Sequence, residues 1–501
     1  MKKTFLSTIA FASVISLYAQ SNSVAILPTD DSATIVRKAA MVVPSARQLR
    51  WQELEVVGFL HFTVNTFTDR EWGLGNESEQ IFNPTELDAK QWIRTCKAVG
   101  IKQVILTAKH HDGFCLWPSK YTEHSVKNSP WKGGKGDVVK EVSDACHEYG
   151  IGFGVYLSPW DRNSAYYGDS AKYNQYFMNQ LTELLTNYGR VDEVWFDGAN
   201  GEGPNGKKQV YNFEAWYNLI RKLQPTAVIA SMGPDVRWVG TESGYGRETE
   251  WSVVPINNLN QNDIAANSQA SVAFKPTGDM TGDDLGSRSK LMNTKGLAWY
   301  PAETDVSIRP GWFYHPSEDT AVKSPEKLLD IYYSSVGRNG VLLLNIPPNR
   351  QGLISKEDSL SLMQWKKMLD ATFKTNLAKG ARIATTNGIN TGSMMDGKLT
   401  TAFTTKSGDT TTINFHLKQP STFDVLWLQE NITIGQRIEN FVLEYKDGEE
   451  WKEAATGTTV GYKRLLRFNP VTAQDVRLRI LAARLQPTIA EFGLYKQANE
   501  Q

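Results

Sequence analysis

The sequence predicts an α/β protein: a (β/α)8-like barrel followed by a C-terminal antiparallel β-sandwich. Three observations predict this fold. Between residues 50 and 373 an amphipathic helix, a short turn and an apolar strand recur along the chain, which is the pattern of parallel strands joined by helices. After residue 373 short alternating runs between turn residues replace the helical spacing, as in antiparallel sheets. The chain of 501 residues is also longer than one hydrophobic core usually supports.

The composition narrows the class of protein. The chain has 41% apolar and 22% charged residues, and its 54 basic residues balance 54 acidic ones. Because the formal net charge is zero, the chain has no general attraction for nucleic acids or anionic lipid. Beyond the N-terminal segment, no stretch has the roughly 18 apolar residues that a membrane span requires. We therefore expect no nucleic-acid partner and no membrane span.

Residues 1–19 resemble a bacterial secretory signal peptide. Lys2 and Lys3 begin it, an apolar stretch follows over residues 5–17, and cleavage is expected after Ala19. The protein is therefore expected to be exported, as a periplasmic or secreted protein, with residues 20–49 as a lead-in to the barrel.

Export would permit disulfides, but the three cysteines are an odd number. Cys96 and Cys146 lie on the apolar faces of predicted helices. We expect all three to be buried thiols.

The barrel is predicted to occupy residues 50–373 with about eight strands, the first at residues 56–62. The clearest unit is a helix over residues 138–149, ended by Gly150, and a strand over residues 151–157, because apolar residues recur at helical spacing in the first and alternate in the second. Further strands are predicted at residues 104–108, 191–196, 227–230 and 341–346, with weaker candidates at 249–253 and 298–302. Further helices are predicted at residues 91–99, 173–188, 213–223, 325–336 and 356–373.

Two segments depart from the barrel pattern. Residues 257–295 are rich in Asn, Asp, Gly, Ser and Thr, and so long a loop is usually functional or mobile. Residues 374–501 are predicted to form the sandwich and resemble a discoidin-like, F5/8-type module. Such a module either binds carbohydrate or only packs against its enzyme, and the sequence leaves both open. Its strands are expected at residues 411–417, 424–429, 440–445, 464–468 and 476–480.

The strand at residues 191–196 runs directly into Asp197. Because side chains alternate along a strand, Trp195 and Asp197 should point into the barrel mouth while Val194 and Phe196 face the helices. Barrel enzymes carry their catalytic groups where the strands end. Asp197 is therefore a candidate catalytic carboxylate, with the capping of the following loop as the alternative.

Four of the seven histidines, His61, His110, His111 and His124, fall in or near the first two loops that follow strands. The adjacent pair at 110 and 111 should point to opposite faces of its strand, and the i, i+4 spacing of a helical zinc site is absent. We expect neither a metal nor an organic cofactor, and we interpret the histidines as hydrogen-bonding groups for a polar ligand.

The distribution of tryptophan indicates a carbohydrate ligand. Of 15 tryptophans only Trp427 and Trp451 lie beyond residue 373, and flat rings stack on the apolar faces of sugars. Those beside predicted strand ends are Trp72, Trp117, Trp160, Trp195, Trp251, Trp299 and Trp312.

Four motifs resemble glycoside hydrolase family 29, the α-L-fucosidases: residues 61–68 with Glu71-Trp72-Gly73, residues 106–117 (LTAKHHDGFCLW), 156–160 (YLSPW) and 194–198 (VWFDG). The resemblance implies an exo-acting, retaining glycosidase with Asp197 as the nucleophile. It also implies a pocket for terminal fucose, with substrate-binding residues His61, Glu71, Trp72, His110, His111, Tyr156 and Trp195.

Residues 237–252 resemble the branch of that family that acts on α-1,3- and α-1,4-linked fucose, in which Glu242 corresponds to the acid/base. Thr241 stands where that branch more often has Asn, and Glu248 and Glu250 are the alternatives. In a retaining enzyme the two carboxyl groups lie about 5 to 5.5 Å apart.

The expected partners are fucosylated oligosaccharides or glycoconjugates of Lewis type, with Trp299, Trp312 and residues 257–295 as candidate walls of the outer subsites. A broad-specificity or α-1,2-acting fucosidase, and a non-catalytic sugar-binding protein, are the alternative functions.

Overall fold

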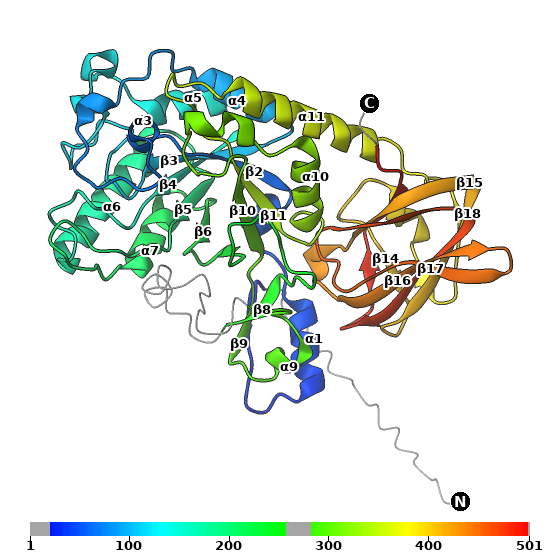
Figure 1. Ribbon diagram of the computed structural model, residues 1–501. Coiled ribbons are helices and arrows are strands. Elements are labelled where there is room, and N and C mark those ends of the chain that lie inside the picture. The colour runs from blue at the N-terminus through cyan, green and yellow to red at the C-terminus, as the bar shows by residue number, and fades with distance from the viewer. Residues whose placement is uncertain (1–20, 257–281, 499–501) are drawn as a thin grey trace, which may run out of the picture.

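The computed structural model describes residues 21–256 and 282–498 (Figure 1). The signal peptide predicted at residues 1–19 and most of the polar segment at 257–295 lie outside the described residues. No helix within the described ranges is both long enough and apolar enough to cross a membrane.

An eight-stranded parallel barrel forms the larger part of the molecule, as predicted. Its neighbouring strands run in the order β6-β5-β4-β3-β2-β11-β10-β7. The two ends of this order approach each other at an isolated bridge between Met232 and Arg237, so the barrel is nearly closed. The strands are β2 (Val56–Leu60), β3 (Gln103–Lys109), β4 (Gly152–Leu157), β5 (Glu193–Phe196), β6 (Val228–Ser231), β7 (Arg237–Trp238), β10 (Ala302–Ser307) and β11 (Val341–Asn345).

Helices surround the barrel and bury their apolar faces against it (Figure 1). They are α4 (Ala89–Ala98), α5 (Val138–Tyr149), α6 (Ser170–Asn187), α7 (Phe213–Leu223), α10 (Pro325–Ser334) and α11 (Lys356–Phe373). Helix α5 has the predicted bounds because the Asp137 carboxylate accepts a hydrogen bond from Lys140 N at 2.9 Å and Gly150 takes the left-handed conformation that ends the helix. Cys96, Cys115 and Cys146 are all buried free thiols, which confirms the prediction.

The two weaker strand predictions were wrong as barrel strands. Segment 249–253 only touches β8 (Val253–Pro255). Segment 298–302 overlaps β9 (Gly296–Trp299) and reaches only the first residue of barrel strand β10. Strands β8 and β9 pair antiparallel with each other, and β9 also pairs with β1 (Ser23–Ala25), in a separate small sheet. The lead-in therefore belongs to this small sheet, with helices α1 (Ser32–Met41), α2 (Ala46–Gln52) and α9 (Arg288–Leu291) beside it.

Barrel strands β7 and β10 have no apolar sequence pattern by which they could be recognised. Strand β7 has only two residues, which is too short for any periodicity. Strand β10 contains Glu303 and Asp305, whose side chains are buried within the barrel. Inward-facing acids break the apolar run by which a central strand is usually recognised.

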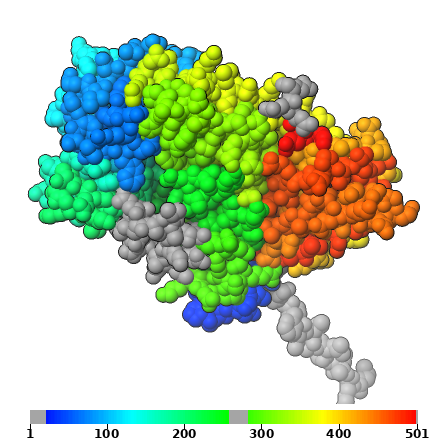
Figure 2. Space-filling view, viewed as in Figure 1, coloured from blue at the N-terminus to red at the C-terminus, as the bar shows by residue number. Residues whose placement is uncertain are grey.

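The C-terminal domain is an antiparallel sandwich with its own apolar core, as predicted. The predicted runs 411–417 and 424–429 are two halves of β15 (Thr411–Gln429), and 464–468 and 476–480 are two halves of β18 (Arg464–Ala483). Figure 2 shows this domain, orange to red, directly against the green part of the barrel, and Val425 and Leu465 extend the barrel's hydrophobic core. The other strands are β12 (Arg382–Thr385), β13 (Gly388–Ile389), β14 (Phe403–Thr405), β16 (Ile438–Asp447), β17 (Glu450–Gly457), β19 (Thr488–Ile489) and β20 (Glu491–Tyr495).

Candidate active site

A cavity of about 570 Å³ opens at the barrel end where the strands finish. Barrel enzymes carry their active sites at this end. Nine of the eleven predicted site residues line the cavity: His61, Trp72, His110, His111, Tyr156, Trp195, Asp197, Glu242 and Trp312. The structure thus brings together residues as far apart in the chain as His61 and Trp312.

Asp197 lies directly after β5, and both of its carboxylate oxygens accept hydrogen bonds. Tyr156 donates to Oδ2 at 3.0 Å, and the backbone N–H of Ala199 donates to Oδ1 at 2.7 Å. His111 Nε2 lies 3.9 Å from Oδ2. Val194 and Phe196 pack into the core beneath the helices while Trp195 and Asp197 face the cavity, which confirms the predicted alternation. This environment fixes the carboxylate but leaves it 26% exposed to the cavity.

Glu242 lies on the loop that follows β7 and faces the same cavity. Its carboxylate accepts a hydrogen bond from Trp312 Nε1 at 3.2 Å. The side chain is accessible to water in the cavity, yet the surrounding protein raises its pKa through desolvation, and the negative charges of Asp197 and Glu71 raise it further. A carboxyl group with a raised pKa is suited to donate a proton near neutrality.

Glu71 does not line the cavity but holds the wall that Trp312 forms. Its carboxylate accepts hydrogen bonds from the backbone N–H groups of Trp312, at 2.7 Å, and Phe313, at 3.3 Å. His315 Nε2 lies 2.6 Å from the same carboxylate. In this structure Glu71 therefore positions Trp312, which in turn contacts Glu242.

The three cavity histidines are buried and neutral. Desolvation lowers the pKa of His61 to about 3 and that of His111 to about 4, and it holds the pKa of His110 well below its ordinary value. His61 Nδ1 lies 2.8 Å from Asn345 Oδ1, and His111 Nδ1 lies 2.8 Å from Ser158 Oγ. Neutral imidazoles held in this way can donate and accept hydrogen bonds to sugar hydroxyls. No cluster of three or more metal-ligating side chains occurs in the part of the chain that the structure describes.

Aromatic rings form much of the cavity wall. Tyr156 and Trp195 stack with ring centroids 5.3 Å apart and an interplanar angle of 20°. Trp72 is 51% exposed at the rim and makes edge contacts with His111 and Trp160. The combination of flat rings with a few polar groups is characteristic of sugar sites.

Trp299 does not line the cavity, contrary to the prediction. It belongs to β9 in the small sheet, where its side chain is 1% exposed and its Nε1 donates to Gln52 at 2.8 Å. The prediction failed because it assigned this segment to a barrel strand, which would have placed the ring near the mouth.

The two alternative acids are held in ion pairs away from the cavity lining. Glu250 is 1% exposed and pairs with Arg237 and Arg247. Glu248 pairs with Arg338 and Arg464, the latter from the sandwich. Glu242 is therefore the acid of this segment that faces Asp197 across the cavity.

Asp305 and Trp238 also line the cavity, although neither is among the predicted site residues. Trp238 Nε1 donates to Asp305 Oδ1 at 2.7 Å, and burial raises the pKa of Asp305 well above its ordinary value. Beneath them Glu303 accepts a hydrogen bond from Trp195 Nε1 at 2.7 Å, and its pKa is raised to about 8 by burial. The alternation of Glu303 and Asp305 along one strand was the available signal.

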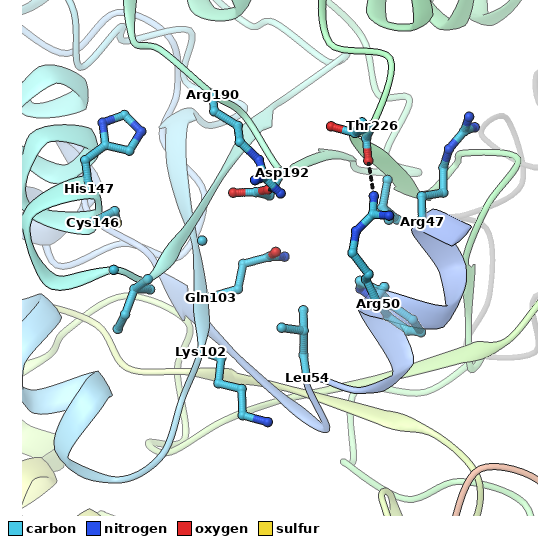
Figure 3. A pocket seen from close by; sticks show the side chains of 15 residues that line it. Arg47, Arg50, Leu54, Lys102, Gln103, Cys146, His147, Arg190, Asp192 and Thr226 are labelled. Atoms are coloured by element: carbon cyan, nitrogen blue, oxygen red, sulfur yellow. Dashed lines mark hydrogen bonds and ion pairs between the residues drawn. The ribbon is translucent and has the colours of Figure 1, made fainter. Parts of the chain in front are cut away.

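A second hollow, of about 410 Å³, lies at the opposite end of the barrel, where strands β3, β4 and β6 begin (Figure 3). Its charged lining is mostly basic: Arg47, Arg50, Lys102 and Arg190. Its one lining carboxylate, Asp192, pairs with Arg190 at 2.5 Å. This hollow therefore lacks the free carboxylate pair of the cavity at the other end.

Comparison with known proteins agrees with this geometry. A family model described as Alpha-L-fucosidase matches residues 46–372, and one described as F5/8 type C domain matches residues 379–492. Alpha-L-fucosidase 1 of Arabidopsis thaliana is 44% identical over 504 residues, which cover 97% of this chain and 92% of that protein.

Solved structures also resemble this chain over nearly its whole length. A proposed alpha-L-fucosidase from Bacteroides ovatus is 48% identical, with a TM-score of 0.85 over 96% of this chain and 79% of that one. A GH29 fucosidase from Ruminococcus gnavus, solved in complex with fucose, is 32% identical, with a TM-score of 0.80 over 95% of this chain and 97% of that one.

Proposed function

Since this chain belongs to the alpha-L-fucosidase family of glycoside hydrolases, we propose that it releases terminal α-1,3- or α-1,4-linked L-fucose from Lewis-type glycans with retention of configuration. One observation carries the proposal. Asp197, after β5, and Glu242, after β7, face a single cavity walled by aromatic rings and neutral histidines. Two carboxyl groups in different environments are what a retaining glycosidase requires.

In the first step the Asp197 carboxylate attacks the anomeric carbon of fucose and forms a covalent ester. The bond to the glycosidic oxygen breaks, and that oxygen takes the proton of Glu242. The hydrogen bonds that Tyr156 and Ala199 donate to Asp197 hold the attacking carboxylate in place.

In the second step the Glu242 carboxylate accepts a proton from water, and the water oxygen bonds to the anomeric carbon. The bond between the anomeric carbon and Asp197 breaks as the new bond forms, which releases fucose and restores the Asp197 carboxylate. Loss of the Asp197 negative charge in the ester removes one of the causes that raise the pKa of Glu242, so the same residue becomes ready to act as a base.

The preference for branched glycans is supported by the rim of the cavity. Trp72 and Trp312 both line the cavity, and Trp72 is 51% exposed at its rim. Stacking on the neighbouring sugars would provide remote binding energy for the reaction. We accordingly assign Trp312, and not Trp299, to the outer subsites.

Hydrolysis of a linkage panel tests this function. We expect release of fucose from Lewis a and Lewis x trisaccharides at higher kcat/KM than from 2′-fucosyllactose or a simple aryl fucoside. Cleavage of 2′-fucosyllactose with both trisaccharides untouched would favour the α-1,2-acting alternative. Binding of fucose without hydrolysis of any member would favour the sugar-binding alternative.

We also propose, from the signal-like sequence of residues 1–19, that the protein is exported to the periplasm or beyond. Fractionation of cells that express the full chain tests this, since a cytoplasmic, uncleaved product would contradict it.

A further inference from the structure

The loop that carries Glu242 is closed at its base by a buried ion pair. The loop leaves the barrel after β7, and Arg237 of that strand pairs with Glu250, thirteen residues along the chain. The two side chains are 2% and 1% exposed. A pair this deeply buried is held in one geometry, because breaking it would leave an uncompensated charge. The base of the loop is thus a fixed point.

The C-terminal side of this loop is bound by the sandwich domain. Arg464, the first residue of β18, donates from Nη1 to the backbone carbonyl of Glu248 at 2.6 Å, and its Nη2 lies 3.4 Å from the Glu248 carboxylate. The backbone N–H of Glu250 donates to Thr459 Oγ1 at 3.1 Å. The Arg464 side chain is 4% exposed, and burial lowers its pKa to about 10.

Gln436, also of the sandwich, holds the backbone just after these contacts. Its amide oxygen accepts from Ser252 N at 2.8 Å, and its amide nitrogen donates to the Glu250 carbonyl at 3.1 Å. The side chain is completely buried. Removing it would leave two buried backbone groups without these partners, and such a loss is far more costly than the loss of an exposed hydrogen bond.

The barrel holds the middle of the same loop through backbone contacts. Gly244 N donates to the Asp305 carbonyl at 3.0 Å, and Gly246 N donates to the Ser334 carbonyl at 2.7 Å. Gly244 has φ +77°, and an added Cβ would lie 2.9 Å from Val306. The loop is therefore packed between two domains, with Glu242 near its free edge above the cavity.

From these contacts we propose that the sandwich domain positions the acid/base loop, and that Arg464 and Gln436 are positioning residues for Glu242. The domain then contributes to proton transfer without touching substrate, whether or not it binds a glycan. This inference rests on the proposed role of Glu242 as the acid/base.

Leaving-group dependence distinguishes positioning from general stability. Displacing a general acid slows departure of a poor leaving group more than departure of an activated one, which needs little protonation. We expect Arg464→Met to lower kcat/KM for phenyl α-L-fucoside about tenfold more than for 4-nitrophenyl α-L-fucoside. Arg464→Lys, which keeps the positive charge but not the planar guanidinium, should show a smaller difference between the two substrates. Gln436→Leu should resemble Arg464→Met.

Lys463 provides the matched control, because it precedes Arg464 and is also a buried cation between the domains. It pairs with Glu55, which immediately precedes β2 at the opposite end of the barrel. Lys463→Met should change kcat/KM by the same factor for both substrates. Equal effects on the two substrates in both Arg464→Met and Lys463→Met would overturn the inference.

Glu242→Gln, assayed with the same pair, separates this inference from the proposed function. If Glu242→Gln shows no leaving-group dependence, its assignment as the acid fails. If Glu242→Gln shows leaving-group dependence and Arg464→Met does not, Glu242 remains the acid and only the positioning role of the sandwich is refuted. Should Arg464→Met not fold, Thr459→Val takes its place, because it removes the hydroxyl that accepts the hydrogen bond from Glu250 N–H. The loss of kcat/KM should again be larger for phenyl α-L-fucoside than for 4-nitrophenyl α-L-fucoside, by a smaller factor than in Arg464→Met, and equal losses would overturn the inference.

Discussion

The two ends of the barrel are built from the same eight strands but have opposite electrostatic character. At the end where the strands finish, Asp197 and Glu242 face a cavity with neutral histidines and no lysine or arginine in its lining. At the end where they begin, four basic side chains surround a hollow whose one carboxylate is already paired (Figure 3). Carboxylates without cationic partners are costly to keep in a folded protein, so their presence at only one of these hollows marks the chemical site.

At the end where the strands finish, uncharged groups hold the two carboxylates in place. Each catalytic candidate is held by neutral donors: Tyr156 and Ala199 N–H for Asp197, and Trp312 for Glu242. Neutral donors orient a carboxylate without the strong charge that would lower the pKa of a general acid.

The largest effect is expected from Asp197→Ala. Without the nucleophile no covalent intermediate forms, so kcat should fall by about 10³-fold or more. The thermal unfolding midpoint should stay close to that of the wild type, because the Asp197 side chain is 26% exposed to the cavity and is not part of the packed core. Steady-state kinetics and calorimetry check the two expectations. Activity within about tenfold of the wild type would exclude this residue as the nucleophile.

A smaller effect, of about 10²-fold on substrates with poor leaving groups, is expected from Glu242→Gln. The raised pKa of Glu242 means that the acid form persists to higher pH than for an ordinary glutamate. In the wild type, kcat/KM should therefore fall as pH rises through that pKa, and the variant should lose this alkaline limb. A pH profile that is unchanged in the variant would assign the limb to another group.

His110→Ala and His111→Ala should each raise KM about tenfold, through loss of hydrogen bonds to sugar hydroxyls. Neither the wild type nor the variants should respond to chelator or to added zinc, because the histidines act as neutral hydrogen-bonding groups. Kinetics before and after dialysis against a chelator test this. Activity that disappears on dialysis and returns with metal would overturn the interpretation.

The smallest effect is expected at the basic end of the barrel. Arg50→Ala and Lys102→Ala change residues of the second hollow whose side chains donate to the backbone carbonyls of Thr226 and Glu53. Because chemistry in barrel enzymes occurs at the other end, kcat/KM should stay within about twofold of the wild type. A large loss of turnover with unchanged stability would mean that the two ends are coupled.

Some elements could be predicted from the sequence because their signals are local. Helix α5 and strand β4 have strong periodicity, a capping aspartate and a terminal glycine, and both were predicted closely. The end of β5 was equally clear, since alternation alone placed Trp195 and Asp197 on the cavity side. Local signals were sufficient wherever one face is apolar and the other is not.

The elements that escaped prediction owe their positions to distant partners. Strand β7 is two residues long, and β10 buries two acids, so neither has an apolar pattern. Trp299 is held by the hydrogen bond from its Nε1 to Gln52, 247 positions away, and its strand β9 pairs with β1 at the start of the described chain. The hold of Glu71 on the Trp312 backbone spans 241 positions. No local pattern in a single sequence encodes contacts at such separations.

Chemical rescue by azide tests the central claim, the roles of Asp197 and Glu242, most directly. Azide needs no deprotonation, so with 4-nitrophenyl α-L-fucoside it should restore turnover in Glu242→Ala by attacking the glycosyl-enzyme, and NMR should identify the product as α-L-fucosyl azide. In Asp197→Gly azide should take the place of the missing nucleophile and give the β anomer. The opposite assignment of anomers, or rescue of Glu248→Ala or Glu250→Ala in place of Glu242→Ala, would contradict the account.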